Sequence, residues 1–329
     1  MTAALVAPDK LRGTATARAA ADSIASVLES RGVQADRCPL SDGGEGFLDV
    51  LGGGNRTSTV TDPQGRSISV PWRLDGDTAV LETALVSANA LSARPGSAEA
   101  ERASSIGCGQ LMAAAIEAGA ASILVGLGGS AFSDGGGGAL AAIEYLLPVT
   151  AEILLATDVR TRYPDAARIY GPQKGADSAA IERLTVQLTR TADKLTRRFG
   201  RDPRTADGTG AAGGLAGALW AVGAELRSGL DIVASQVNLD QRLAQADLIV
   251  TAEGRLDATS LAGKVVGGLM DRADGRPVWI LAGRVEPGLK VPGATVVDLS
   301  AEYGSDRAMT DTLACLAAGV VSIVERSEA

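Results

Sequence analysis

Residues 3–13, AALVAPDKLRG, join a short apolar run to a turn that carries three charged residues and ends in glycine. The apolar run is typical of a buried β-strand. An alanine-rich stretch at 14–31 predicts a helix, and residues 33–38 predict a second strand that leads into SDGGEG (41–46). This order of strand, helix and strand is typical of an α/β protein.

The pattern changes after this first unit and later returns. Short runs at 57–60, 67–74 and 78–82 are separated by DPQG and DG turns, which predicts consecutive hairpin strands. Alternation then predicts further strands at 122–127, 152–156, 248–252, 277–283 and 294–299, and helices at 98–118, 139–146, 177–199, 260–272 and 309–326.

The last strands can rejoin the sheet that the first strands begin. We therefore predict two α/β domains. A discontinuous, Rossmann-like, three-layer domain of residues 1–56 and 240–329 holds both termini, and residues 57–239 form an inserted second α/β domain.

The composition excludes several kinds of catalysis. No histidine occurs in 329 residues, which removes Ser-His-Asp and Cys-His nucleophile systems and most catalytic zinc sites. Cys38, Cys108 and Cys315 lie far apart and form no CxxC pair, so neither a metal knuckle nor a disulfide framework is indicated. Acid–base work must fall to carboxylates or lysines.

The net charge and the aromatic content limit the kinds of partner that the protein can bind. A net charge of −8 and only 3% aromatic residues disfavour nucleic acid. The N-terminus lacks the basic region and long apolar core of a signal peptide, and the longest uncharged stretch, 208–224, opens with a glycine loop and does not resemble a spanning helix. We expect a cytoplasmic protein with no membrane partner.

Six short segments place charged residues beside glycines, and they are the strongest indication of function. Glycine lets backbone N–H groups approach an anion, and the neighbouring side chains can hold a metal, a hydroxyl or a phosphate. This set favours phosphoryl transfer, which depends on positioning and electrostatics more than on a strong base. The segments are PDKLRG (8–13), SDGGEG (41–46), GLGGSAFSDGGGG (126–138), GPQKGA (171–176), DGTGAAGG (207–214) and TAEGRLDATSLAGK (251–264).

The 126–138 segment follows a predicted strand and precedes a predicted helix, so its amides and the helix N-terminus could hold phosphates. It is neither a P-loop nor a dinucleotide fingerprint, because no GK[ST] follows it and no G-x-G-x-x-G fits it. The alternative is a tight turn in which Asp134 caps the helix.

Asp42 and Glu45 lie where the first sheet should end, which is where open α/β sheets bind their ligands. The alternative for Asp42 is a helix cap. Arg255 and Asp257 follow the strand at 248–252 and could form either part of the site or a structural ion pair. The glycines of 207–214 could simply allow close helix packing.

Four cations lie in or beside these glycine segments, namely Lys10, Arg12, Lys174 and Lys264. A point charge on a glycine loop suits phosphate oxygens. Taken singly, each could instead be an ordinary solvated cation.

In order and spacing, the segments APDKLRG, PLSDGGEG, GLGGSAFSDGG, GPQKGA, GTGAAGGL, TAEGRLD and ILAGRV resemble the type 1 glycerate kinases of bacteria over essentially the whole chain. The resemblance implies a two-domain α/β enzyme that phosphorylates D-glycerate with ATP and Mg²⁺, commonly to 2-phosphoglycerate, in the cleft between the domains. It implies a small-molecule partner and a monomer or homodimer. It leaves the phosphorylated hydroxyl open.

Site residues follow from the positions that match the family's motifs. The catalytic candidates are Asp42, Asp257 and Lys10; the substrate-binding candidates are Asp9, Arg12, Gly43, Gly44, Glu45, Arg255 and Lys264; the ATP-binding candidates are Gly128, Gly129, Ser130, Gly135 and Lys174; and the Mg²⁺ candidates are Asp134 and Asp158.

The chain also departs from the family's pattern. DVRTRYPDAARIY (158–170) is shorter than the usual segment and lacks its Asn-Pro-Leu. The single-residue departures are Phe47, Phe132, Ser133, Ala252 and Thr259. These changes keep a second hypothesis open, a degenerate kinase that binds a small hydroxy acid as a metabolite-sensing regulator.

Overall fold

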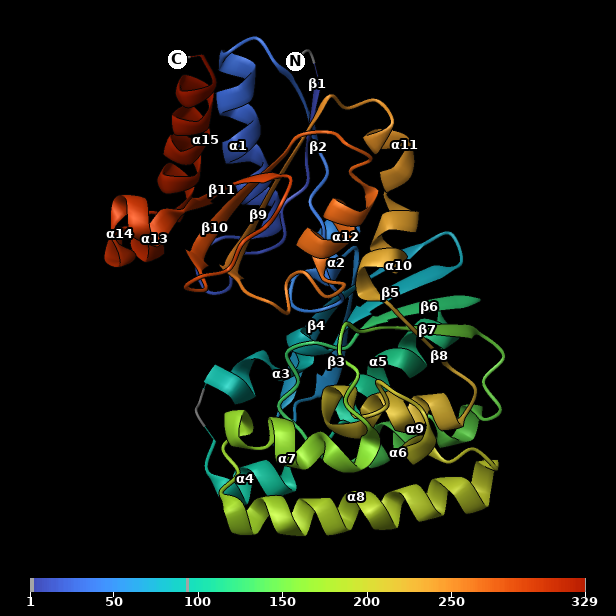
Figure 1. The fold of residues 1–329 in the computed structure, drawn as a ribbon. Helices are drawn as coiled ribbons and strands as arrows, with labels where there is room; N and C mark the ends of the chain where they lie inside the picture. Colours follow the sequence, from blue (N-terminus) through green and yellow to red (C-terminus); the bar gives the residue numbers. More distant parts are fainter. Residues whose placement is uncertain (1–2, 93–94, 329) are drawn as a thin grey trace. The chain divides into compact units, whose positions relative to one another are not determined.

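The computed structural model describes residues 3–92 and 95–328, which form two compact units (Figure 1). Unit 1 contains the described residues through Asp42, Asp49–Leu51 and those from Leu230 onward. Unit 2 contains Gly43–Leu48 and the described residues of Gly52–Gly229. The chain thus first passes from unit 1 to unit 2 inside the SDGGEG segment, returns to unit 1 for Asp49–Leu51, and returns to it again at Leu230.

Unit 1 has a parallel sheet of five strands among the described residues. Its order is β11 (Ala294–Asp298), β10 (Val278–Val285), β9 (Leu248–Leu256), β1 (Ala3–Val6) and β2 (Gln34–Arg37). Ala4 pairs with Leu248, so strands separated by more than two hundred residues are neighbours. The prediction that the last strands rejoin the first sheet is confirmed.

Helices cover both faces of this sheet. On one face, α1 (Ala17–Ser30) and α15 (Thr312–Glu328) lie side by side, and α11 (Leu239–Leu243) and α12 (Val265–Arg272) lie on the other (Figure 1). Ile24 of α1 and Leu316 of α15 pack with Val250 and Leu281 in one apolar core. The remaining helices of this unit are α13 (Leu299–Tyr303), α14 (Ser305–Thr310) and, from its second residue, α10 (Gly229–Gln236). The short helix α2 (Phe47–Val50) is divided between the two units after Leu48.

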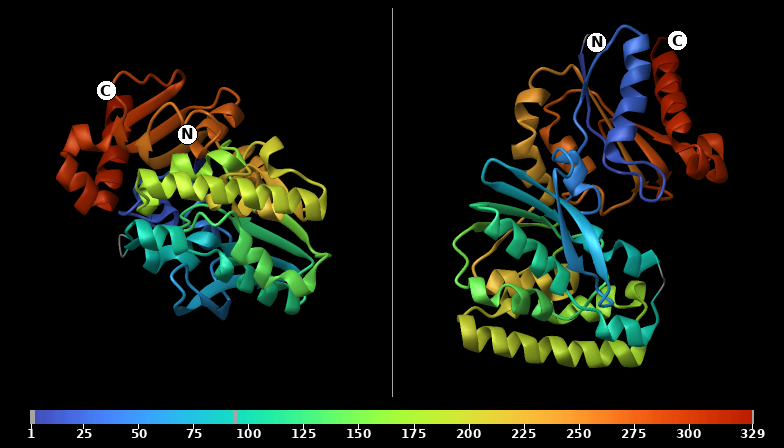
Figure 2. Two further views of the ribbon diagram at one scale, coloured as in Figure 1. Left: turned by 90° about the horizontal axis from the view of Figure 1, so that it is seen from below. Right: turned by 180° about the vertical axis from the view of Figure 1, so that it is seen from behind.

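The sheet of unit 2 is mixed. Its described strands run in the order β3 (Arg56–Thr61), β4 (Ser67–Asp75), β5 (Thr78–Glu82), β6 (Ser122–Gly126), β7 (Glu152–Ala156) and β8 (Glu225–Arg227). The predicted hairpin strands are the antiparallel strands β3, β4 and β5, and β3 and β4 form one edge of the sheet (right panel of Figure 2). From β5 to β8 all pairings are parallel.

The helices of unit 2 correct one prediction. Instead of one helix over 98–118, the chain forms α4 (Ser97–Arg102) and α5 (Ile106–Glu117). The break arises because Ser104 N–H donates to Pro63 O and Ser105 N–H donates to Asp134 Oδ2. The other helices are α3 (Thr83–Ser92), α6 (Gly137–Ala142), α7 (Ala166–Tyr170), α8 (Ser178–Phe199) and α9 (Leu215–Ala221).

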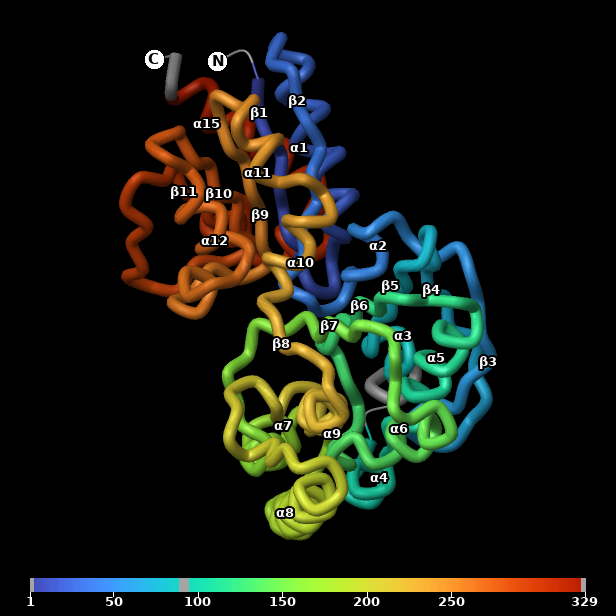
Figure 3. The backbone as a smooth tube through the Cα atoms, turned by 90° about the vertical axis from the view of Figure 1, so that its right-hand side faces the viewer, coloured from blue at the N-terminus to red at the C-terminus, as the bar shows by residue number. Residues whose placement is uncertain are grey.

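The long helix α8 packs against α7 and α9 on the outside of unit 2 (Figure 3). Asp177 caps it by accepting a hydrogen bond from Ala180 N–H. Within residues 3–92 and 95–328, no helix has the length and apolar character needed to span a membrane.

Candidate active site

The strand order of unit 1 reverses between β1 and β9. From β1 the chain continues to β2 on one side, and from β9 it continues to β10 and β11 on the other. Open α/β sheets bind their ligands at such a point, beyond the carboxyl ends of the strands. Asp9 and Lys10 follow β1 after Ala7 and Pro8, and Glu253 lies in the last part of the neighbouring β9. Asp9 N–H donates to Ala252 O at 2.9 Å, which fixes the turn against β9.

Three of the predicted site residues meet here. Lys10 Nζ lies 3.4 Å from Asp42 Oδ1 and 3.5 Å from Asp9 Oδ1. Burial raises the pKa of Asp9 to about 6, although the Lys10 ammonium lowers it. Burial opposes the charge of Lys10, but the two carboxylates outweigh it and raise its pKa. The cluster therefore keeps a charged ammonium between two acids, one of which titrates near neutral pH.

Glu253 is a further member of this cluster, and sequence reasoning gave it no role. Burial raises its pKa to about 8, against the hydrogen bond that Ser260 Oγ donates to its Oε2 at 2.9 Å. Its Oε1 is buried and finds no hydrogen-bond partner in the described part of the chain. Its signal in the sequence is an acid that follows an apolar strand directly, in LIVTAEG (248–254).

We expect Glu253 to make the protein less stable as the pH rises. The folded protein keeps this proton up to about pH 8, whereas a glutamate of ordinary pKa 4.5 releases it. Stability should fall between these values, by at most about 1.4 kcal/mol per pH unit. Glu253→Gln should reduce the loss between pH 6 and 8, as measured by urea unfolding at both values.

Two other groups bear on this measurement. Asp9, whose pKa is about 6, is half titrated at the lower end of this window and adds a smaller loss of stability in the same direction. Buried Lys174, whose pKa is lowered to about 7, acts in the opposite sense because its folded form binds fewer protons. The comparison is therefore made with Glu325→Gln, a change at an exposed glutamate of the same unit. An equal pH dependence in both variants would contradict the role of Glu253.

Asp257 has a more local environment. Its Oδ1 accepts hydrogen bonds from Thr259 N–H at 2.9 Å and Thr259 Oγ1 at 2.6 Å, and these bonds lower its pKa. Arg255 Nε lies 3.5 Å from its Oδ2, but the Arg255 side chain is 67% exposed. This geometry favours the structural alternative for the Arg255–Asp257 pair. Because of this turn, α12 begins at Val265 rather than at the predicted residue 260.

Of the remaining cations of unit 1, Arg12 is exposed and Lys264 is half-buried. Lys264 directly precedes α12, and its charge lowers the pKa of both Glu253 and Asp257. Lys264 thus belongs to the electrostatic surroundings of the acidic cluster.

In unit 2, two glycine segments pack backbone against backbone. Gly128 N–H donates to Gly43 O at 3.2 Å, and a Cβ on Gly128 would lie 2.4 Å from Gly44 Cα. Only glycine allows this approach. The loop after β6 and the second half of SDGGEG therefore form one surface, on which Glu45 is exposed.

Asp134 is occupied by hydrogen bonds within the protein. Its Oδ2 accepts from Ser105 N–H and Ser105 Oγ, each at 2.9 Å, and from Gly138 N–H at 3.1 Å, while its Oδ1 accepts from Gly136 N–H at 3.1 Å. These contacts are those of a turn and helix cap, which is the alternative interpretation of Asp134. Its role as a Mg²⁺ ligand stays a prediction. The helix N-terminus that we expected to hold phosphates is that of α6. The first N–H groups of this helix already donate hydrogen bonds to other groups of the protein.

Other amides of the same loop remain available. Among the described residues, none accepts a hydrogen bond from Gly129 N–H or Ser130 N–H. Both residues follow β6, at the carboxyl ends of the parallel strands of this sheet. Gly129 is half-buried, so its amide can reach a ligand.

Lys174 lies beneath this loop. It is 4% exposed, and its Nζ donates to Phe132 O at 2.6 Å and to Ser130 Oγ at 3.0 Å. Burial lowers its pKa to about 7. Lys174 therefore holds the loop in place from inside.

Asp158, the other predicted Mg²⁺ ligand, is exposed and follows β7. No group of three or more His, Cys, Asp or Glu side chains among the described residues could hold a metal.

We expect Asp134→Asn to destabilise the protein. Four donors converge on Oδ2, including Ser104 Oγ at 3.5 Å, and an amide group cannot accept from all of them while keeping the bond at Oδ1. Unsatisfied buried donors cost about 1–3 kcal/mol, which lowers the Tm by roughly 2–10 °C. Asp177→Asn is the matched control, because asparagine caps a helix about as well as aspartate. Equal melting temperatures for both variants would show that Asp134 is free to take another role.

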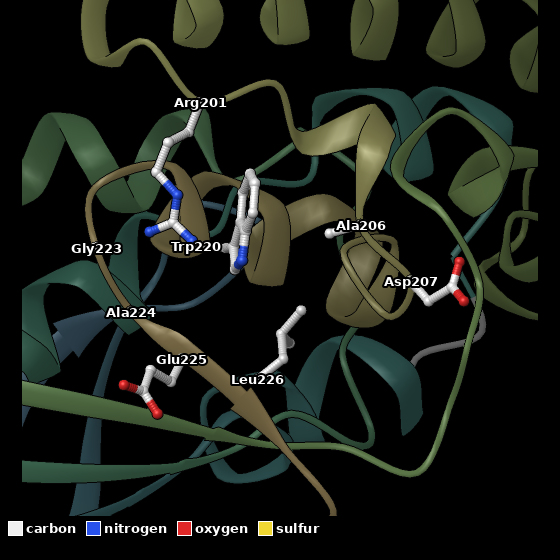
Figure 4. Close-up of a pocket in the computed structure, with 8 residues that line it drawn as sticks. All are labelled: Arg201, Ala206, Asp207, Trp220, Gly223, Ala224, Glu225 and Leu226. Carbon is white, nitrogen blue, oxygen red and sulfur yellow. The ribbon is translucent and has the colours of Figure 1, made fainter.

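Unit 2 also contains a hollow of about 430 Å³ between Arg201, Ala206, Asp207, Trp220 and the start of β8 (Figure 4). The Arg201 guanidinium lies 3.8 Å from the centre of the Trp220 ring. Asp207 and Glu225 already pair with Arg162 and Arg227. None of the predicted site residues lines this hollow.

Comparisons with known proteins agree with this architecture. The family model described as "Glycerate kinase family" matches residues 4–152 and 148–303. The chain is 31% identical to the glycerate 2-kinase of Escherichia coli over 325 residues, which cover 85% of this chain and 84% of that protein. It is 42% identical to an uncharacterized protein of Mycobacterium bovis over 303 residues, or 85% and 78% of the two chains.

A solved structure is similar over the full length of both chains. It is that of a candidate glycerate kinase 2 from Salmonella typhimurium LT2, with a TM-score of 0.80 and 28% identity. The fold and these matches define the protein as an α/β enzyme of the kinase class. More narrowly, the chain belongs to the glycerate kinase family.

Proposed function

We propose that the protein transfers the γ-phosphoryl group of ATP to a hydroxyl group of D-glycerate, with 2-phosphoglycerate as the favoured product. The observation that carries this proposal is the cluster of Lys10 with Asp9 and Asp42 at the reversal point of the unit 1 sheet. A buried ammonium between acids suits an acceptor that has both a carboxylate and hydroxyls.

Each unit would bind one substrate. In unit 1, Asp42 orients the attacking hydroxyl and accepts its proton, and Lys10 binds the glycerate carboxylate or the transferred phosphoryl group. The other proposed contacts to glycerate in unit 1 are Asp9, Arg12, Arg255 and Lys264. Gly43, Gly44 and Glu45, which belong to unit 2, stay predictions.

In unit 2, the free amides of Gly129 and Ser130, beside Gly128, would hold the phosphates of ATP. Gly135 and Lys174 would keep the loop in shape. Asp134, directly or through water, and Asp158 are the proposed carboxylates for Mg²⁺, which would neutralise charge on the transferred group when bound.

The test is to incubate the protein with ATP, Mg²⁺ and D-glycerate and to identify the phosphorylated product by NMR. We expect ADP and 2-phosphoglycerate, and no turnover in EDTA. Phosphorylation at the 3-hydroxyl would correct the product alone. Glycerate binding without any ADP release would overturn the proposal in favour of a metabolite-binding regulator.

A further inference from the structure

We infer that Tyr163 is the positioning residue for the glycine loop at 128–138, and that its hydroxyl supports nucleotide binding through this loop. The inference rests on the proposed function for its link to ATP. Tyr163 lies in 158–170, the segment in which the chain departs from the family's pattern.

Tyr163 is fully buried among α7, α8 and α9. Its hydroxyl donates a hydrogen bond to Gly135 O at 2.7 Å. A Cβ on Gly135 would lie only 2.3 Å from this hydroxyl oxygen, and Gly135 has φ of +69°. The position of the tyrosine ring therefore requires glycine at 135, since any larger residue there would displace the hydroxyl.

The same tyrosine is tied to the glycine segment at 207–214. Tyr163 N–H donates to Thr209 Oγ1 at 3.1 Å. Gly135 N–H, on the loop that the hydroxyl holds, donates to Gly213 O at 3.0 Å. Tyr163 therefore connects two glycine segments that are far apart in the sequence.

Two buried side chains hold the carbonyls of the loop. Lys174 Nζ donates to Phe132 O, and the Tyr163 hydroxyl donates to Gly135 O. These two hydrogen bonds fix the carbonyl groups of Phe132 and Gly135, which lie on either side of Asp134 in the sequence. The loop begins with the free amides of Gly129 and Ser130. Loss of the tyrosine hydroxyl leaves Gly135 O without its donor and loosens the loop, while the ring keeps its packing.

The test compares Tyr163→Phe with Tyr170→Phe. Tyr170 lies in the same departing segment, and its hydroxyl bonds to Thr161 Oγ1 at 2.8 Å rather than to the glycine loop. The first measurement is amide hydrogen exchange. In Tyr163→Phe the amides of 135–139 should exchange about three to ten times faster, with α8 unchanged, and the control should match the wild type.

The second measurement is steady-state kinetics with ATP and D-glycerate. Tyr163→Phe should raise the KM for ATP about three- to tenfold and leave the KM for glycerate unchanged. Unchanged loop exchange, or an equal rise in both KM values, would overturn the inference. A wild-type protein without kinase activity would overturn the proposed function, and with it the link to ATP, while faster exchange would still establish Tyr163 as the support of the loop.

Discussion

Asp42→Asn is expected to lower kcat by about 10²- to 10⁴-fold, the usual span for loss of a general base. Asp42 lies 3.4 Å from Lys10 Nζ, at the point where the chain leaves unit 1. No histidine is present to take its place. Since the amide keeps the shape of the side chain, the Tm and the affinity for glycerate should stay close to those of the wild type. Turnover and calorimetric binding of glycerate measure the two effects separately.

Asp257→Asn is the matched comparison. Its carboxylate is used by the turn at Thr259, so we expect turnover within a few-fold of the wild type. The reverse result, with Asp42→Asn active and Asp257→Asn inactive, would transfer the role to Asp257. If neither change affects turnover and Asp9→Asn does, the base is Asp9, whose pKa of about 6 also suits the task.

Lys10→Met should lower kcat/KM by about 10- to 100-fold, because a charge-assisted hydrogen bond contributes about 1.5–3 kcal/mol. Methionine keeps the stem and removes the charge. The ammonium also lowers the pKa of Asp9, a proposed contact to glycerate, so the part of the acid limb of the kcat/KM profile that Asp9 contributes should move to higher pH in the variant. Steady-state kinetics across the pH range measure both effects.

The control for this variant is Lys290→Met, which removes an exposed lysine of the same unit. It should retain the wild-type profile. Normal kinetics in Lys10→Met would show that the ammonium only neutralises Asp9 and Asp42.

The part of the fold that could be predicted is the part that local patterns determine. Alternating apolar strands and helices placed β1, β2, β9, β10 and β11 in one sheet, and the DPQG and DG turns placed the hairpin strands. The short strand β8 has the sequence ELR and no apolar run, so no pattern marks it. The helix break at Ser105 depends on Asp134, which lies 29 residues away.

The candidate site could be located but not fully assigned. Charged residues next to glycines indicated the functional loops at the carboxyl ends of the strands. The side chains of Asp9, Lys10 and Asp42 do lie together there. Whether a carboxylate faces a ligand or its own backbone depends on loop conformation, which spacing alone does not reveal. For this reason the sequence does not reveal that Ser105 donates to Asp134, or that the Tyr163 hydroxyl donates to Gly135 O.

The pairing of β1 with β9 constrains how the protein can be made. A ribosome adds about 5–20 residues per second, so β1 emerges tens of seconds before the strand that completes its side of the sheet. Meanwhile every strand of unit 2 has been synthesised. Unit 2 can thus finish folding first, while the edge of β1 that later pairs with β9 is still unpaired. A newly made chain should be most prone to aggregation, and most dependent on chaperones, during this interval.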